Sequence, residues 1–95
     1  MEQDKNPIQV AGRLFAALEY LADSGPSGLS DIAWAIGLNK STAHRIMASL
    51  QYMGYVTQNR EDSRYEATFK VVELANRIVV HADLSGRVRP HVKKL

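Results

Sequence analysis

The stretch GLNKSTAHRIMASL, residues Gly37 to Leu50, decides the fold because its two faces differ in chemistry. Apolar side chains recur at Ala43, Ile46, Met47 and Leu50, and this i, i+3, i+4, i+7 spacing predicts the buried face of an α-helix. The opposite face offers hydroxyls and positive charge and almost no acid. A solvated helix usually mixes acidic with basic residues, whose i,i+4 pairs support it, so this face indicates a partner other than water.

Length and composition indicate one small domain without thiol chemistry. The chain has 95 residues, enough for a limited core, and no cysteine, so disulfides, thiolate zinc sites and cysteine nucleophiles are excluded. The net charge is +2, but residues 54–95 carry eight basic and five acidic side chains, against four and five in residues 1–53. The basic excess therefore lies towards the C-terminal half.

Nothing in the sequence predicts secretion or a membrane span. Residues 1–7 form a polar tail without the apolar region of a signal peptide, and no segment approaches 18 apolar residues. We expect a cytoplasmic protein with no membrane partner.

Four helices and one hairpin are predicted along the chain. Residues 10–23 form the first helix, and its expected core stripe is Ala11, Leu14, Phe15, Leu18, Leu21 and Ala22. Residues 29–36 form a short second helix, and residues 40–53 form the third, capped by Asn39 and ended by Gly54. Strands at 55–58 and 64–68 flank the polar turn NREDS, and a fourth helix covers 69–83.

The region after the fourth helix predicts a domain boundary. Residues 84–86 contain a glycine, and residues 85–95 have the character of the start of another helix after a domain that spans 8–84. Apolar residues off the main stripes are candidates for a dimer surface, although scattered exposed apolar residues are also normal. These are Val10, Ala16, Ala17, Tyr20, Val72 and Val80.

Residues 29–48 have the spacing of a helix-turn-helix. Counting from Leu29, the fifth position is Ala33, where two helices must approach closely, and the ninth is Gly37, where the turn favours a residue without a Cβ. The fifteenth and eighteenth positions, Ala43 and Ile46, face the core. With the hairpin at 55–68 as a wing, the predicted fold is mainly α with a small β-hairpin, a winged helix-turn-helix.

In such a fold the third helix enters the major groove of double-stranded DNA, which accounts for its donor-rich face. The Arg45 side chain is long enough, and its guanidinium has paired N–H donors, to bind both the O6 and N7 atoms of a guanine. Lys40 lies where a phosphate would lie. The further candidates for contacts with bases or phosphates are Ser41, Thr42, His44, Ser49, and, at the tip of the wing, Arg60 and Arg64. Glu61 and Asp62 dilute the charge of the wing.

The stretch GLNKSTAHRIMASLQYMGYV resembles the IclR family of bacterial transcription regulators, whose pattern is close to G-L-x-K-S-T-x-H-R. Ile8, Gln9 and Arg13 fit the opening of the family pattern, and DIA, RY and VVELAN fit further segments, so the resemblance covers residues 8–95. It implies DNA contacts at Lys40 and its neighbours Ser41, Thr42, His44 and Arg45.

The resemblance also implies a homodimer or tetramer, a palindromic operator, and a domain after Leu95 that binds a small-molecule effector. Residues 85–95 would then be the start of the linker helix to that domain. We therefore expect a domain of a longer protein. The sequence departs from the family at three positions: Ser63 stands where glycine is usual in the wing, Asn39 where proline is frequent, and Gly28 where serine or threonine is usual. The departure at Ser63 predicts a different or strained wing turn.

A second function stays open at this level: a winged helix used only for association with another protein, with its contact on the first helix. An enzyme is not expected, because NKST lacks the glycines of a P-loop and GPSG is not a nucleophile elbow. No cofactor or metal is expected either, since His81 and His91 lie ten residues apart without other ligands nearby.

Overall fold

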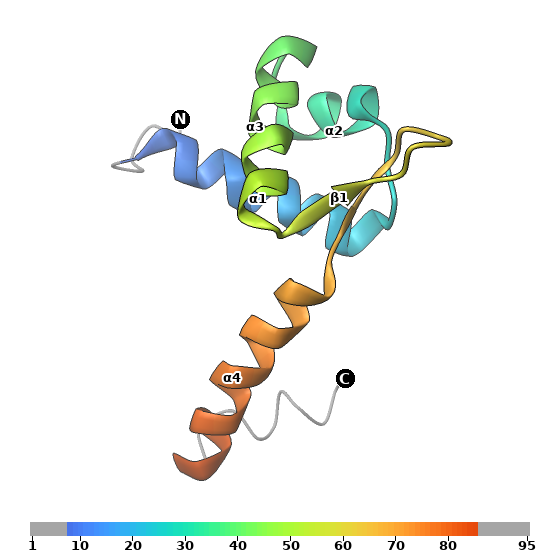
Figure 1. Cartoon of the computed structure of the whole chain (residues 1–95). Helices are drawn as coiled ribbons and strands as arrows, with labels where there is room; N and C mark the ends of the chain where they lie inside the picture. The colour runs from blue at the N-terminus through green and yellow to red at the C-terminus, as the bar shows by residue number, and fades with distance from the viewer. Residues whose placement is uncertain (1–7, 86–95) are drawn as a thin grey trace.

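The computed structural model describes residues 8–85, and the side chains of residues 8–82. Three helices form a compact body, a two-stranded hairpin leaves it on one side, and a fourth helix leaves it on another (Figure 1). The elements in chain order are α1 (Gln9–Ser24), α2 (Leu29–Ile36), α3 (Lys40–Met53), β1 (Val56–Gln58), β2 (Tyr65–Ala67) and α4 (Phe69–Ser85). The predicted winged helix-turn-helix is confirmed, with each element within two residues of its expected bounds.

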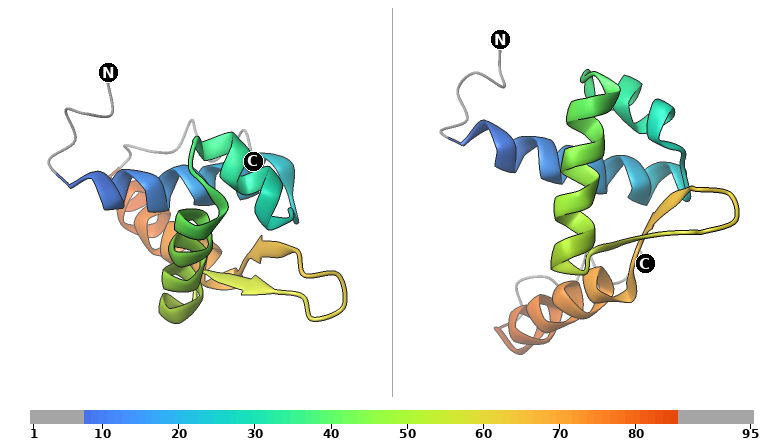
Figure 2. Two further views of the ribbon diagram at one scale, coloured as in Figure 1. Left: turned by 90° about the horizontal axis from the view of Figure 1, so that it is seen from above. Right: turned by 45° about the horizontal axis from the view of Figure 1, so that its top comes forward.

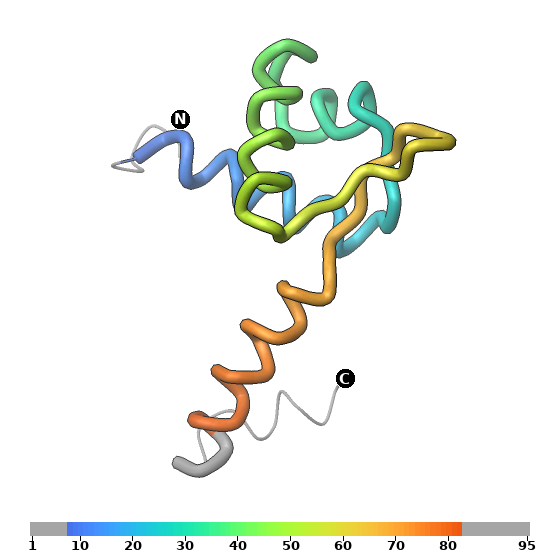
Figure 3. Tube along the Cα trace, in the orientation of Figure 1, coloured from blue at the N-terminus to red at the C-terminus, as the bar shows by residue number. Residues whose placement is uncertain are grey.

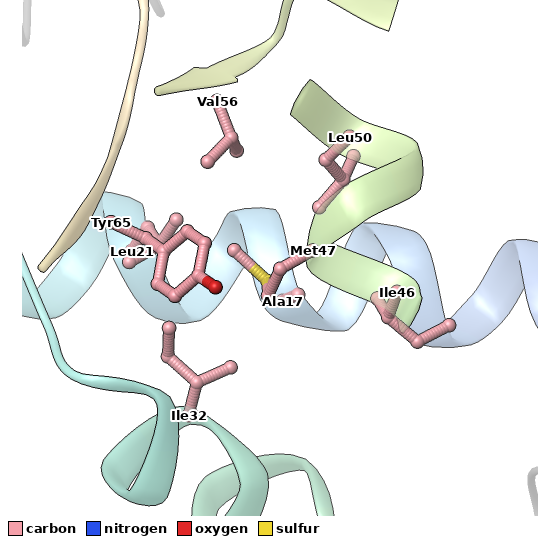
Figure 4. Close-up of a cluster of buried hydrophobic side chains, with 8 residues drawn as sticks. All are labelled: Ala17, Leu21, Ile32, Ile46, Met47, Leu50, Val56 and Tyr65. Carbon is pink, nitrogen blue, oxygen red and sulfur yellow. The ribbon is translucent and has the colours of Figure 1, made fainter. Parts of the chain in front are cut away.

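The core lies where α3 crosses α1, with α2 and the hairpin closing its sides. Its buried side chains come from all four parts: Ala17, Leu21, Ile32, Ile46, Met47, Leu50, Val56 and Tyr65. Figure 4 shows the Met47 side chain pointing towards the ring of Tyr65, with Ala17 and Ile32 beside them. Because Ala17 is fully buried and small, it allows the backbones of α1 and α3 to come close.

Local hydrogen bonds fix where α3 begins and ends. The Thr42 backbone N–H donates to the side-chain oxygen of Asn39 at 2.8 Å, which is the expected N-cap. Gly54 follows the last helical residue in the left-handed region, with φ 89°. The third helix therefore begins and ends where the sequence predicts.

Two side chains from the start of α4 also hold the C-terminal end of α3. The Thr68 hydroxyl donates to the Gly54 carbonyl at 2.7 Å, and Lys70 Nζ donates to the Met53 carbonyl at 2.7 Å. The same ammonium lies 4.8 Å from the centre of the Tyr55 ring. Carbonyls at the end of a helix have no intrahelical donor, so these two bonds satisfy groups that would otherwise need water.

The hairpin is joined to the body through one buried tyrosine. Strands β1 and β2 are antiparallel, with Val56 opposite Ala67 and Gln58 opposite Tyr65. Tyr65 is 2% exposed and exchanges two backbone hydrogen bonds with Ser27, of 2.8 and 3.0 Å, in the loop between α1 and α2. Burial raises the pKa of its phenol above the ordinary value of 10.0.

The expected core stripe of α1 was wrong at its edges. Phe15 is 63% exposed and Ala22 is exposed, whereas Ala17, which was expected to lie off the core stripe, is fully buried. Apolar residues occur on most sides of this helix, so periodicity alone did not select the face. The crossing of α3 selects it, because Ala17 lies beneath that helix.

Helix α4 extends away from the body and shares no extensive packing with it in the described part of the chain (Figure 3). It continues two residues beyond the expected end at residue 83. The polar tail at 1–7 and the linker segment after residue 85 lie outside the described residues. Within residues 8–85, no helix is both long and apolar enough to cross a membrane.

Two turns of the structure use the left-handed backbone region with different residues. Gly37, in the turn between α2 and α3, has φ 73°, and a Cβ added there would meet no atom within 4 Å. Ser63, in the wing turn, has φ 63° and is the sole residue other than glycine with positive φ in the described range. Ser63 thus adopts a strained backbone conformation in the wing turn, as its place in the sequence predicts.

Exchanging the two residue types should change stability in opposite directions. We expect Gly37→Ser to lower the free energy of unfolding by about 1 kcal/mol and Ser63→Gly to raise it by a similar amount, since only glycine adopts positive φ without cost. Urea unfolding followed by circular dichroism measures both. A loss of stability in Ser63→Gly would show that the serine is not strained.

Removing the Thr68 hydroxyl should loosen the end of α3. Thr68→Val keeps the shape but loses the bond to Gly54 and the 3.3 Å bond from the Lys70 N–H, so we expect a loss of about 1–2 kcal/mol. The matched control is Thr57→Val, because Thr57 is exposed and its hydroxyl has no bond within the described residues. Equal urea midpoints for the two variants would contradict a structural role for Thr68.

Candidate nucleic-acid interface

The outward face of α3 gathers most of the residues predicted to contact DNA. Lys40, Ser41, His44, Arg45 and Ser49 are all exposed on this one helix. Their position follows from the packing of the other face, since a helix that buries every third or fourth side chain must turn the intervening ones outward. Thr42, the sixth predicted residue of this helix, is half-buried, and its backbone N–H donates to the side chain of the N-cap residue Asn39.

The polar side chains of this face have no partner inside the protein. None of the five exposed side chains makes a hydrogen bond or an ion pair with any other residue that the structure describes. The first turn of α3 contains no acidic residue. Arg45 can therefore offer all five of its N–H donors, and Lys40 all three, to an external acceptor.

The N-terminal end of α3 adds to this positive character. Asn39 accepts only one of the N–H groups of the first turn, the one of Thr42. The remaining N–H groups there point out of the helix and carry the partial positive charge of its dipole. With Lys40 and Ser41 in the same turn, this end of the helix favours an anion such as a phosphate.

The two arginines of the wing form a separate cluster. The hairpin tip, with Arg60 and Arg64, projects from the helical body (Figure 2), and both side chains are exposed. The turn is built by its acidic and amide neighbours: the Asn59 side chain accepts from the backbone N–H groups of Glu61 and Asp62, at 2.7 and 3.2 Å. The Asp62 carboxylate in turn accepts from the Arg64 backbone N–H at 2.9 Å.

One of the two carboxylates in the wing thus has a structural role. This role explains why an acidic residue lies in sequence between the two arginines. Asp62 holds the backbone of the turn, whereas Glu61 is exposed and its side chain makes no bond within the described residues. The structure brings the residues of α3 onto one face but leaves the wing arginines apart from them.

The outward face of α3 holds two further residues that were not predicted to contact DNA. Ala48 and Tyr52 continue the line of Ser41 and Arg45 at helical spacing, and Tyr52 is 92% exposed. The signal was present in the sequence, because positions 41, 45, 48 and 52 are four, three and four residues apart.

Residues 8–85 hold no cluster of three histidine, cysteine or acidic side chains that could bind a metal ion. Two hollows in the surface of the described residues adjoin α1. One lies between α1 and the C-terminal half of α3 and is lined by Leu14, Ala48, Ser49, Tyr52 and Met53. Another lies between α1 and the turn that precedes α3, with Gln9 and Arg13 at its edge.

Comparison with known proteins assigns this chain to a family. The model of the IclR helix-turn-helix domain matches residues 10–60, which span α1, α2, α3 and the first strand of the hairpin. The matched region contains the whole outward face of α3.

Two curated relatives match most of the chain. The glycerol operon regulatory protein of Streptomyces griseus is 40% identical over 81 residues, which cover 84% of this chain and 32% of that protein. The HTH-type transcriptional regulator KdgR of Escherichia coli is 30% identical over 83 residues, which cover 85% of this chain and 32% of the relative. Both are transcription regulators rather than enzymes, and the chain spans about a third of their length.

A solved structure supports the fold. The IclR family transcriptional regulator from Brucella abortus superimposes with a TM-score of 0.71 at 22% sequence identity, and the match covers 77% of this chain and 28% of that one. At this level of identity the likeness concerns the arrangement of helices and hairpin.

Proposed function

The chain belongs to the IclR family of transcriptional regulators, and we propose that its helix-turn-helix domain binds a specific sequence of double-stranded DNA with α3 in the major groove. One observation carries the proposal. The face of α3 opposite the core carries donors without internal partners and no acid in its first turn. Such a face fits the acceptor-rich floor of a major groove and the phosphates at its edges.

The residues of α3 take different roles in this proposal. Arg45, near the middle of the exposed line, donates two hydrogen bonds to O6 and N7 of a guanine and so reads sequence. Lys40, at the N-terminal end, neutralises a phosphate and so adds affinity without specificity. Ser41 and His44 reach base edges or phosphates, and Thr42 and Ser49 bond the backbone on either side.

The wing contributes a weaker contact. Arg60 and Arg64 reach the sugar-phosphate backbone or the minor groove, and the neighbouring Glu61 reduces the local positive charge. This part of the interface therefore depends more on salt than on sequence.

Selection from a pool of random duplexes at low salt tests the proposal directly. Enrichment of a defined sequence is the expected result. A chain that retains no duplex would exclude DNA binding by this domain and would favour the alternative, a winged helix that associates only with other proteins.

Substitutions on α3 should separate contacts that recognise bases from contacts that bind phosphates. Arg45→Ala should weaken the preferred duplex by about 1–3 kcal/mol and relax the choice of one base pair. Lys40→Ala should weaken all duplexes alike and lower the slope of log affinity against log salt by about one unit. Fluorescence anisotropy titrations on preferred and scrambled duplexes at several salt concentrations measure both effects.

Arg77→Ala on α4 is the control, because this arginine is exposed but lies on another helix. It should bind both duplexes as the parent does. If Arg45→Ala keeps the preference of the parent at every base pair, the assignment of α3 to the major groove is wrong.

We further propose that two copies associate through α4 and read an inverted repeat. Val71, Leu74, Ala75 and Ile78 have the i, i+3, i+4, i+7 spacing of one face, and Ile78 is 59% exposed while Leu74 is 40% exposed. In the described part of the chain no other element packs extensively against α4, and apolar helix faces of this kind usually mark a contact between proteins.

The first helix offers a second apolar area. Phe15, at 63% exposure, and Ile8, at 65%, lie on its outer side, so α1 of one copy and α4 of the other have matching chemistry. Ala17, an earlier candidate for this surface, is in the core and takes no part. Because a two-fold dimer presents two α3 helices, its operator would be an inverted repeat with half-sites about one helical turn apart.

A charge placed on the apolar face of α4 should break the dimer. Ile78→Glu should raise the dissociation constant of the dimer by roughly tenfold or more, because a carboxylate without a partner would be buried. The sequence also made Val80 a candidate for the dimer surface, but Val80 lies on the side of the helix opposite Ile78. Val80→Glu is therefore the matched control, because Val80 is 58% exposed and lies outside the proposed contact. Sedimentation equilibrium measures both, and a parent chain that stays monomeric, or an Ile78→Glu variant that dimerises like it, would contradict the proposal.

A further inference from the structure

The outward face of α3 changes chemistry along its length. Ser41 and Arg45, in the N-terminal half, are hydrogen-bond donors, whereas Ala48 and Tyr52, in the C-terminal half, present a methyl group and an aromatic ring. All four lie on one line opposite the buried face. The surface that would face the DNA therefore has a polar half and an apolar half.

Tyr52 has no apolar neighbour that covers its ring. It is 92% exposed, more than any other large hydrophobic residue of the described part, and its hydroxyl makes no hydrogen bond there. The hollow beside it, between α1 and α3, is lined mainly by apolar groups, including Leu14 and Met53, and by no charged side chain. A partner that covers this area must offer an apolar group to it.

The most prominent apolar group on the floor of a major groove is the C5 methyl of thymine. Alanine methyls and aromatic rings are among the side chains that contact it. The apolar half of α3 is continuous with the polar half that carries Arg45, so a helix that reaches guanine with Arg45 brings Ala48 and Tyr52 to the neighbouring base pairs.

On the basis of the proposed function, we propose that Ala48 and Tyr52 are specificity residues that read thymine through its methyl group. The helix rises about 1.5 Å per residue, so Ala48 lies about 4.5 Å and Tyr52 about 10.5 Å beyond Arg45 along its axis. With a base-pair rise of about 3.4 Å, these thymines lie about one to three base pairs from the guanine that Arg45 contacts. The ring of Tyr52 makes this contact, and its hydroxyl is not required.

Replacement of single thymines by uracil tests the proposal, because this change removes one methyl and keeps every hydrogen-bonding group of the base. The probe is the duplex that the parent chain selects, with one uracil at a time in each half-site. Loss of a buried methyl should weaken binding by about fourfold. We expect this loss at one or two positions within about three base pairs of the guanine that Arg45 reads.

Variants of the chain show which residue causes each loss of affinity that follows the replacement of thymine by uracil. In Tyr52→Ala, the thymine and uracil duplexes should bind equally at the position that Tyr52 covers, and Ala48→Ser should do the same at the nearer position. Tyr52→Phe keeps the ring without its hydroxyl and should behave as the parent does. Because both positions are exposed, circular dichroism and the urea midpoint should match the parent for all three variants.

Each of these results would overturn the inference alone: a half-site without thymine in this interval, a thymine-to-uracil series without any penalty, or a penalty that persists in both Tyr52→Ala and Ala48→Ser. A Tyr52→Phe variant as weak as Tyr52→Ala would also overturn it, since the contact would then be made by the hydroxyl. If the parent selects no duplex sequence, the proposed function fails and this inference fails with it.

Discussion

The burial of one face of α3 is the constraint on which the rest of the structure depends. Met47 is fully buried and Leu50 is 1% exposed, and each large side chain buried in this way stabilises the fold by about 1.5–3 kcal/mol. Rotating the helix by one residue, about 100°, would bring His44 and Gln51 into the core in place of apolar groups. That cost fixes the rotation of the helix, and with it the line of side chains that faces outward.

The two ends of α3 are held by different means, and this difference connects the domain to α4. The start of the helix depends on a local cap by Asn39, whereas its end is bonded by Thr68 and Lys70 from the beginning of α4. Because α4 has no other extensive packing on the body, these bonds at its first turn are its main attachment in the described residues. A partner that binds the apolar face of α4 would therefore act on the same end of α3 that carries Tyr52.

The wing illustrates how a departure from the family pattern is accommodated. Ser63 adopts the positive φ that glycine would adopt without cost, and bonds from Asn59 and Asp62 hold the turn around it. The hairpin is fixed to the body at Tyr65 rather than at its tip, so strain in the turn does not disturb the core. Asp62, one of the two acidic residues that dilute the charge of the wing, also shapes its turn.

The sequence by itself determined the helices, the caps of α3, the hairpin and the donor-rich face of Lys40 to Ser49, because each depends on spacing or on bonds between near neighbours. Tertiary structure decided the rest. It chose Ala17 rather than Phe15 for the core of α1, since apolar residues surround that helix and only the crossing of α3 selects a side. Among the described residues it also left α4 without extensive packing on the body, because whether an apolar stripe is buried depends on a neighbouring surface and not on the helix that carries it.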